Sequence, residues 1–395
     1  MAFGDNARMS AQFIERANRS DRAAATGAVV TCTLGADVDP EGHDARTRSC
    51  IAEKLASLLG YTFAGEFDDA DEYVGKLYFV PSDAITADRA ASLHIATERD
   101  LFGGVVGHRF AATKAITHPL LDSTAYTPEG WVAPFSQAVA GSVLEGFTAF
   151  TRDDARRAVA TQLEHGLVRV KRTLGIGGSG QYVVDAIGEL DAVLADIDDA
   201  ELSSVGIVVE ENLDDVTTYS IGEVRVGDLV ASYHGTQRLT HNNRGNAVYG
   251  GSSLFVVRGE LASLLDAPLP DTLRVAVTQA RTYDAAAQAH LPRFLASRRN
   301  YDVMQGTDAR GRAKSGVLEQ SWRIGGASGA EVAALLAFDA DPSLMAVHAA
   351  TTEIYGDSPP PPTDATVYFR GVDARAGFLT KYSRIEPHAY ARRTR

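Results

Sequence analysis

Residues 168–180 read Val-Arg-Val-Lys-Arg-Thr-Leu-Gly-Ile-Gly-Gly-Ser-Gly. The alternation of valine with Arg169 and Lys171 predicts a strand, and the glycines that follow predict a loop. Because glycine has no Cβ, the backbone amides of such a loop are free to close around an anion. The next residues, Gln-Tyr-Val-Val at 181–184, again favour a strand. The stretch therefore predicts two antiparallel strands joined by a glycine loop, with Lys171 before the loop.

Three common phosphate-binding patterns do not fit this loop. Gly175, Gly177 and Gly180 match G-x-G-x-x-G, but a dinucleotide site needs a helix directly after the loop, and a strand pattern follows here. A P-loop ends in Gly-Lys-Ser/Thr, and a protein kinase places its lysine after the glycines rather than before them. Two interpretations stay open: a lysine and a glycine loop that hold the phosphates of ATP, or a surface hairpin with a solvated lysine.

The composition is that of a folded protein with more than one core. The chain has 395 residues, of which 45% are hydrophobic and 23% are charged. A formal net charge of −13 disfavours binding to nucleic acid or to an anionic membrane, and no apolar run is long enough to span a bilayer. Cys32 and Cys50 form no Cys-x-x-Cys motif, which excludes a thiolate zinc site and a disulfide framework. We expect a cytoplasmic protein.

The order of the predicted elements indicates an α/β fold with an α+β part. Strand and helix patterns alternate through the first hundred residues, which favours a small parallel α/β domain. Gly227-Asp228 joins two extended segments and predicts an antiparallel hairpin. The Asn- and Gly-rich residues 241–251 are long and polar enough to form a lid over a site.

Two acidic residues fall on a second predicted hairpin. With a turn near residues 310–311, Asp302 and Glu319 lie opposite or nearly opposite each other. Like charges so placed destabilise a sheet by roughly 0.2–1 kcal/mol unless a cation binds between them. Two oxygen donors that leave other positions to water and phosphate are typical of a Mg²⁺ site that holds a nucleotide. The alternative is an exposed hairpin with solvated acids, but the flanking Val303-Met304 and Val317-Leu318 indicate half-buried strands.

Taken together, these motifs resemble those of the ATP-grasp superfamily. The resemblance lies in Lys-x-x-x-Gly-x-Gly-Gly-x-Gly at 171–180, Val-Val-Glu-Glu-Asn-Leu at 208–213, and Asp302 with Leu-Glu-Gln-Ser-Trp-Arg-Ile-Gly-Gly-Ala-Ser at 318–328. More narrowly, residues 101–382 resemble a bacterial ATP-grasp family that is a domain of unknown function. The resemblance implies a pre-grasp α/β domain over residues 1–105, a small lobe with the glycine loop over 106–200, and a large lobe with a metal site over 201–395.

The resemblance also implies roles for individual residues in binding ATP. Lys171 is expected to contact the phosphates, and Lys114 matches the family's earlier ATP-contacting lysine. The phosphates would be covered by the loop residues Gly175, Gly177, Gly178, Ser179 and Gly180. The adenine-binding hinge would be formed by Glu210, Glu211 and Leu213.

The metal ligands and catalytic residues follow from the same resemblance. Asp302 and Glu319 match the acidic ligands of Mg²⁺, for which Mn²⁺ can substitute. Ser321 stands where the family usually has an asparagine ligand, which puts a second metal position in doubt. Arg323 matches the following arginine, and Arg299 or its neighbour Arg298 is expected to reach the γ-phosphate or a substrate carboxylate. The expected catalytic set is Lys171, Arg299 and Arg323.

The activity implied by the resemblance is ATP-dependent ligation. A small-molecule carboxylate would be phosphorylated and then joined to an amine, or less often to a thiol. Two alternatives stay open: a phosphotransferase that acts on a hydroxyl, and a nucleotide-binding regulator without catalysis, for which Ser321 is the sole hint. The sequence identifies neither substrate, and it leaves open whether the protein forms a homodimer.

Overall fold

The computed structural model describes residues 26–35, 39–175, 180–386 and 391–392. An N-terminal sheet has the order β2-β1-β3 with all strands parallel, and helix α2 packs beside it. These elements are β1 (Gly27–Cys32), α2 (His43–Leu59), β2 (Thr62–Glu66) and β3 (Lys76–Pro81). The prediction of a small parallel α/β unit at the start of the chain is confirmed.

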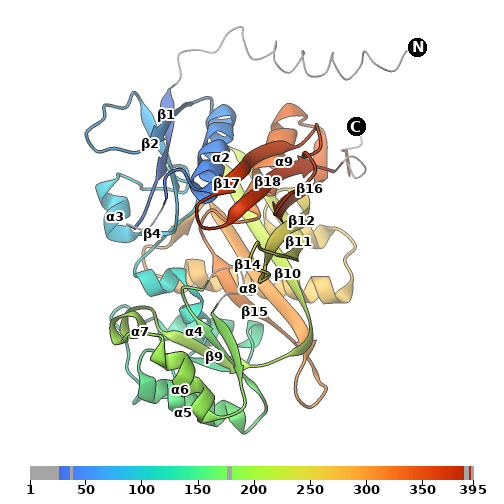
Figure 1. Cartoon of the computed structure of the whole chain (residues 1–395). Helices are drawn as coiled ribbons and strands as arrows, with labels where there is room; N and C mark the ends of the chain where they lie inside the picture. Colours follow the sequence, from blue (N-terminus) through green and yellow to red (C-terminus); the bar gives the residue numbers. More distant parts are fainter. Residues whose placement is uncertain (1–25, 36–38, 176–179, 387–390, 393–395) are drawn as a thin grey trace.

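A second unit, which we call the small lobe, carries the glycine loop. Its antiparallel sheet has the order β6-β9-β7-β8, and its helices pack on that sheet (Figure 1). The strands are β6 (Gly146–Ala149), β7 (Val168–Arg172), β8 (Gln181–Val184) and β9 (Ile207–Glu211), and the helices are α5 (Arg152–Leu163), α6 (Ile187–Ala195) and α7 (Asp199–Val205). β9 belongs to this sheet although its residues were predicted for the large lobe, because this apolar strand is buried between β6 and β7.

The predicted strand–loop–strand hairpin is confirmed. β7 pairs with β8 in an antiparallel register that sets Lys171 opposite Gln181. Gly180 has a φ of +68°, a backbone conformation that strongly favours glycine, and its carbonyl accepts from the Arg172 amide at 2.8 Å. The loop residues Gly177, Gly178 and Ser179 lie outside the described part of the chain.

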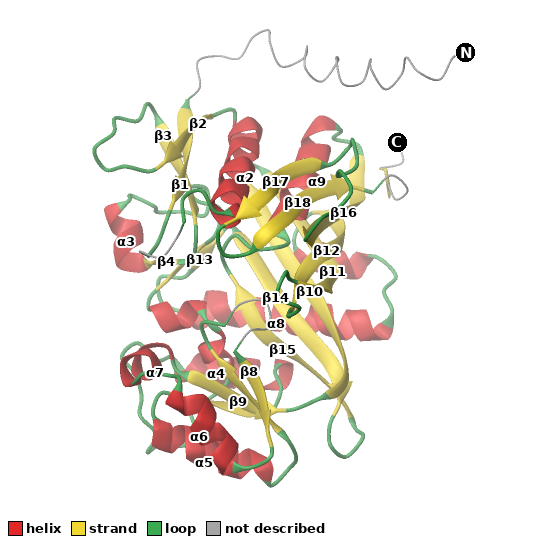
Figure 2. Cartoon of the chain, in the orientation of Figure 1, coloured by secondary structure: helices red, strands yellow, loops and turns green. Residues whose placement is uncertain are grey.

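A large curved sheet forms the body of the molecule (Figure 2). Its strand order is β15-β14-β10-β11-β12-β16-β18-β17, and β19 pairs with β16. The bounds are β10 (Asp214–Val226), β11 (Leu229–His241), β12 (Ala247–Arg258), β14 (Arg298–Thr307), β15 (Ala313–Ser321), β16 (Leu344–Tyr355), β17 (Thr366–Asp373), β18 (Gly377–Ile385) and β19 (Ala391–Arg392). Together with the small lobe, this sheet confirms the predicted α/β fold with an α+β part.

Two helices cover opposite faces of the large sheet. α8 (Asp271–His290) packs on β14 and β15, and α9 (Ser328–Ala340) packs on β11, β12 and β16. Shorter elements connect these units: β4 (Ile85–Thr86), α3 (Ala87–Ser92), β5 (Gly104–Val106), α4 (Ala133–Val139) and β13 (Leu295–Ala296), with 3-10 turns at Arg109–Ala112, Lys114–Thr117, Ala140–Ser142 and Leu261–Asp266. No helix in the described ranges is both long and apolar enough to cross a membrane.

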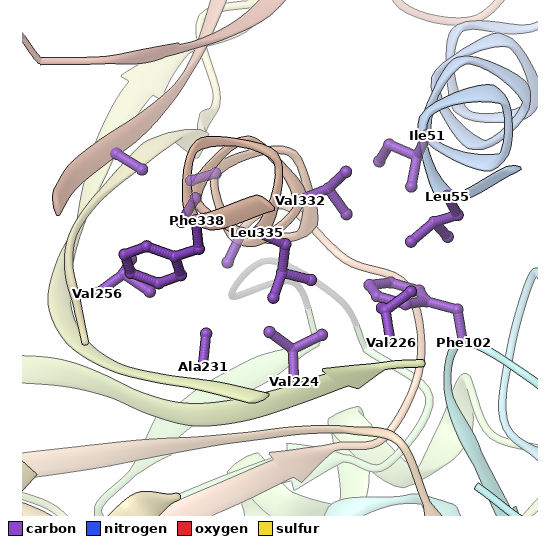
Figure 3. Packing of buried hydrophobic residues seen from close by; sticks show 14 of the residues in the cluster. Ile51, Leu55, Phe102, Val224, Val226, Ala231, Val256, Val332, Leu335 and Phe338 are labelled. Carbon is purple, nitrogen blue, oxygen red and sulfur yellow. The ribbon is translucent and has the colours of Figure 1, made fainter. Parts of the chain in front are cut away.

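One core joins the N-terminal sheet to the large sheet. Figure 3 shows α9 between the helix α2 and the strands β10, β11 and β12, with apolar side chains facing inward from all of them. A fully buried Val, Leu or Phe side chain contributes roughly 1.5–3 kcal/mol to folding, so these two units are tied together by a substantial shared interface. The contributors include Ile51, Leu55, Phe102, Val224, Val226, Ala231, Val256, Val332, Leu335 and Phe338.

The interpretation of residues 241–251 as a lid is wrong. β11 and β12 extend through most of this segment and leave a short turn at 242–246, closed by the Asn242 amide donating to the Asn246 carbonyl at 2.9 Å. The Tyr249 hydroxyl lies 2.9 Å from Thr351 Oγ1 on the neighbouring strand β16. The β-branched and aromatic residues Val248 and Tyr249 favour a strand more strongly than the neighbouring Asn and Gly residues favour a loop.

Two histidines flank a phenylalanine on the face of the sheet opposite α9. His234, Phe255 and His348 are direct cross-strand partners on β11, β12 and β16. The Phe255 ring centroid lies 5.3 Å from that of His234 and 5.0 Å from that of His348. Burial, together with the neighbouring His348, lowers the pKa of His234 to about 4. His234 is therefore neutral in the folded protein at neutral pH.

Replacing His234 with leucine is expected to make the fold less sensitive to acid. In the unfolded chain His234 takes up a proton near pH 6.5, whereas in the folded chain it does so only near pH 4, so the wild type loses stability as the pH falls between these values. As the pH falls through this range, the free energy of unfolding of the variant should decrease by about 1–2 kcal/mol less than that of the wild type, after allowance for the partial exposure of His234. Urea unfolding at pH 7 and pH 4.5 measures this difference, with the exposed His165→Gln as control. If the free energy of unfolding decreased equally in wild type and variant between pH 7 and pH 4.5, the prediction would be contradicted.

Candidate functional site

Lys114 connects the small lobe to the large sheet. It begins the 3-10 turn Lys114–Thr117, and its side chain is almost completely buried. Its Nζ lies 3.1 Å from the carbonyl oxygen of Gly175, the first glycine of the loop, and 2.7 Å from Glu319 Oε2 on β15. The start of the glycine loop and one of the two predicted acidic ligands therefore meet at a single lysine.

A second buried lysine is held by a carboxylate on the neighbouring strand. Lys171 on β7 forms an ion pair with Glu210 on β9, and both side chains are at most 2% exposed. His118 Nε2 lies 3.1 Å from the other oxygen of Glu210. Burial alone would raise the pKa of Glu210, but Lys171 and His118 hold it at about 2. Burial lowers the pKa of Lys171, and the Glu210 carboxylate opposes that shift.

The predicted adenine hinge lies where the small lobe joins the large sheet. The Glu210 side chain contacts Lys171 and His118. Glu211 instead accepts a hydrogen bond from the Glu145 amide at 3.1 Å and forms an ion pair with Lys314 Nζ at 3.1 Å. Lys314 belongs to β15, so this ion pair crosses from the small lobe to the large sheet. Leu213 is buried in a small cluster with Leu144, Met304 and the half-buried Leu318.

The predicted pairing of the two acidic residues is confirmed. Asp302 on β14 and Glu319 on β15 are direct cross-strand partners. Burial and the Glu319 charge raise the pKa of Asp302, whereas Lys114, Lys171 and Arg323 hold the pKa of Glu319 below its usual value despite burial. Asp302 Oδ1 accepts hydrogen bonds from Ser220 Oγ at 2.9 Å and from Asn300 Nδ2 and Gln237 Nε2 at 3.0 Å.

These two carboxylates fit a cation whose other ligands come from outside the protein. Among the residues that the structure describes, no group of three or more His, Cys, Asp or Glu side chains is placed to hold a metal ion. Burial and the neighbouring Glu319 charge both raise the pKa of Asp302, and a divalent cation beside the two carboxylates would stabilise the ionised form. Oxygen donors of this kind suit Mg²⁺ or Mn²⁺ completed by water and phosphate.

The structure separates the predicted arginines. Arg323 lies near the N-terminal sheet, with its Nε 3.7 Å from Asp83 Oδ1. Arg299 lies on the α8 face of the sheet, where it pairs with Glu223 and Asp284 and lines a cavity of about 680 Å³. Side chains alternate along a strand, so residues 298, 300 and 302 share one face and Arg299 points to the other. Arg299 is therefore not brought together with Asp302. Arg298 shares the face of Asp302, but its side chain is buried in an ion pair with Glu331.

Several polar residues of the site were not predicted. His118 and Gln237 come from distant parts of the sequence, and nothing in their local context distinguishes them from structural residues. Asn300 could have been found, because it lies two residues before Asp302 and so shares its face. Ser321 lies at the end of β15 opposite Asn300, and its hydroxyl accepts from Arg298 Nη1 at 3.1 Å.

The fold is similar to those of solved enzymes. Biotin carboxylase from Campylobacter jejuni shares 10% identity, with 91% of this chain and 87% of that chain covered and a TM-score of 0.46. Phosphoribosylamine–glycine ligase from Thermotoga maritima shares 14% identity, with 90% and 91% covered and a TM-score of 0.47. D-alanine–D-alanine ligase from Bacillus anthracis shares 11% identity, with 75% and 87% covered and a TM-score of 0.43. No protein with a curated function matches the sequence.

The sequence profile of one family matches most of the chain. The match covers residues 30–383, a range that includes Lys171, Asp302 and Glu319. The predicted resemblance to a family of unknown function is thereby confirmed. The chain belongs to the family described as protein of unknown function (DUF3182).

Proposed function

We propose that this protein is an ATP- and Mg²⁺-dependent ligase that joins a small-molecule carboxylate to an amine, or to a thiol, through an acyl phosphate. The observation that carries the proposal is the position of Lys114, which contacts both the start of the glycine loop and Glu319. Lys171 lies close enough to Lys114 and Glu319 for their charges to act on its pKa. Two buried ammonium groups, a glycine loop and two paired carboxylates in one site match the charge distribution of Mg²⁺-bound ATP.

The residues of this chain have distinct roles in that proposal. Lys114 and Lys171 bind phosphate oxygens, and the ionised Glu210 keeps Lys171 charged in its buried position. The backbone amides around Gly175 and Gly180 approach the phosphates without a Cβ in the way. Asp302 and Glu319 hold Mg²⁺, which when bound offsets the negative charge of the nucleotide. Arg323, which is partly exposed between the large sheet and the N-terminal sheet, binds the substrate carboxylate.

The chemistry needs little acid or base catalysis from side chains. A carboxylate oxygen forms a bond to the γ-phosphorus while the bond to the β–γ bridging oxygen breaks, and ADP leaves. The amine nitrogen then attacks the acyl carbon, phosphate leaves, and the nitrogen loses a proton. The lysines and Arg323 contribute by neutralising the charge that develops on the transferred phosphoryl group and on the acyl oxygen.

A panel of carboxylates and amines assayed for release of ADP tests this proposal. We expect one carboxylate to give ADP and free phosphate in equal amounts with its amine, and to give a hydroxamate when hydroxylamine replaces the amine. Reactions without Mg²⁺, with EDTA present, are the control and should release no ADP. ADP formed with a phosphorylated product and no free phosphate would identify a phosphotransferase instead. ATP binding without turnover on any substrate would favour a regulatory protein.

A further inference from the structure

Arg298 is a buried cation at the edge of the proposed metal site. Its side chain is 2% exposed, and its Nη2 and Nε lie 2.7 Å and 3.0 Å from the two carboxylate oxygens of Glu331, which is fully buried in the first turn of α9. Its remaining nitrogen, Nη1, lies 2.5 Å from the carbonyl oxygen of Arg323 and 3.1 Å from both the carbonyl oxygen and the Oγ of Ser321. Arg298 therefore connects the start of α9 to the residue that stands where an asparagine ligand was expected.

A second chain of contacts runs from Glu331 to Asp302. The Tyr233 hydroxyl lies 2.6 Å from Glu331 Oε1 and 2.9 Å from Asn300 Oδ1. Asn300 in turn donates from Nδ2 to Asp302 Oδ1 at 3.0 Å. Glu331 thus anchors two buried chains of contacts, one that ends at Ser321 and one that ends at Asp302. Groups of this kind fix the orientation of metal-binding side chains.

We infer that the site holds a single divalent cation, bound by Asp302 and Glu319. We also infer that Ser321 is not a metal ligand, because its oxygens accept hydrogen bonds from Arg298. The inference rests on the proposed function and names the metal content of its site. Both oxygens of Ser321 lie 3.1 Å from one nitrogen of Arg298, Nη1, and the guanidinium remains protonated at all relevant pH values. A cation placed on the serine would meet the positive ends of these donors at short range.

Through these two chains of contacts, Glu331, Arg298 and Tyr233 act as positioning residues for the groups of the metal site. They do not reach the reacting atoms but hold Asn300 and Ser321, the groups beside the cation. Removing the Tyr233 hydroxyl frees Asn300 to turn away from Asp302 while leaving the apolar packing of the ring intact. Second-sphere changes of this kind weaken metal binding by about 10- to 100-fold.

The test is a Mn²⁺ titration of the full-length protein with a non-hydrolysable ATP analogue, followed by electron paramagnetic resonance. We expect one Mn²⁺ per bound nucleotide in the wild type, with no broadening from a second nearby ion. Ser321→Ala should bind one Mn²⁺ with unchanged affinity, whereas Tyr233→Phe should bind one Mn²⁺ about tenfold more weakly with nucleotide affinity retained. The triple variant Arg298→Met, Glu331→Leu, Ser321→Asn removes both buried charges together and restores the amide; it should bind a second Mn²⁺.

Each contrary outcome has a separate meaning. Two Mn²⁺ ions in the wild type, or a tenfold loss of affinity in Ser321→Ala, would overturn the single-cation inference and leave the proposed function intact. Unchanged Mn²⁺ affinity in Tyr233→Phe would overturn the positioning role. A wild-type protein that binds neither the ATP analogue nor Mn²⁺ would overturn the proposed function, and the inference with it.

Discussion

Replacing Lys171 with methionine is expected to lower both the free energy of unfolding and the affinity for ATP. The change leaves the buried Glu210 carboxylate without its main counter-charge, and breaking a buried ion pair from one side costs about 3–5 kcal/mol. It also removes a charged donor to the phosphates, which should weaken ATP binding roughly 10- to 100-fold. Urea unfolding measures the first effect, and calorimetric titration with an ATP analogue measures the second.

The double variant Lys171→Met, Glu210→Gln separates the two effects. With both charges gone, the glutamine still accepts or donates a hydrogen bond to His118, and most of the lost stability should return. ATP affinity should stay low, because the phosphates still lack the ammonium group. A double variant that recovers ATP affinity along with stability would show that Lys171 serves the fold and not the nucleotide.

Replacing Asp302 with asparagine is expected to change activity and stability in opposite directions. Loss of a cation ligand should lower the turnover of ATP by about 10²–10³-fold. The same change removes the repulsion between Asp302 and Glu319, so the free energy of unfolding without ligand should rise by up to about 1 kcal/mol at neutral pH. Because the folded-state pKa of Asp302 is raised, this gain is present above that pKa and disappears as the pH falls through it.

Asp308→Asn is the matched control on the same hairpin. Asp308 accepts hydrogen bonds from the amides of Arg310 and Arg312 and from the Arg312 side chain, and these contacts lower its pKa to about 2. The control should therefore lose stability at neutral pH and keep its turnover. The prediction for Asp302 fails if Asp302→Asn is less stable than the wild type, or if the two variants lose turnover equally.

The sequence predicted the parts of the site that depend on local geometry. A hairpin with a defined turn fixes its own register, which is why the pairing of Asp302 with Glu319 was accessible from the spacing alone. The glycine-loop hairpin followed for the same reason, because strand patterns flank the glycines on both sides. The same alternation of side chains along a strand places Arg298 on the face of Asp302 and Arg299 on the opposite face.

Contacts between residues far apart in the sequence could not be predicted. His118 reaches Glu210, and Tyr233 reaches Glu331, only because several sheets and helices pack in a particular way. The place of β9 depends on tertiary structure in the same way, since its sequence predicts a buried strand in either unit and its pairing with β6 and β7 is long-range. The lid predicted at 241–251 is wrong because Val248 and Tyr249 favour a strand and pair into the large sheet, which leaves the Asn and Gly residues a short turn.

The distribution of the cores determines which parts of this molecule can move independently. The N-terminal sheet and the large sheet share one core through α2 and α9, whereas the helices and strands of the small lobe pack around a core of their own. In mechanical terms, these cores divide the described chain into two bodies rather than three. The Lys114 contact to Gly175 and the Lys314 pair with Glu211 both link the small lobe to residues outside it. A rotation of the small lobe relative to the large sheet would therefore strain both contacts at once.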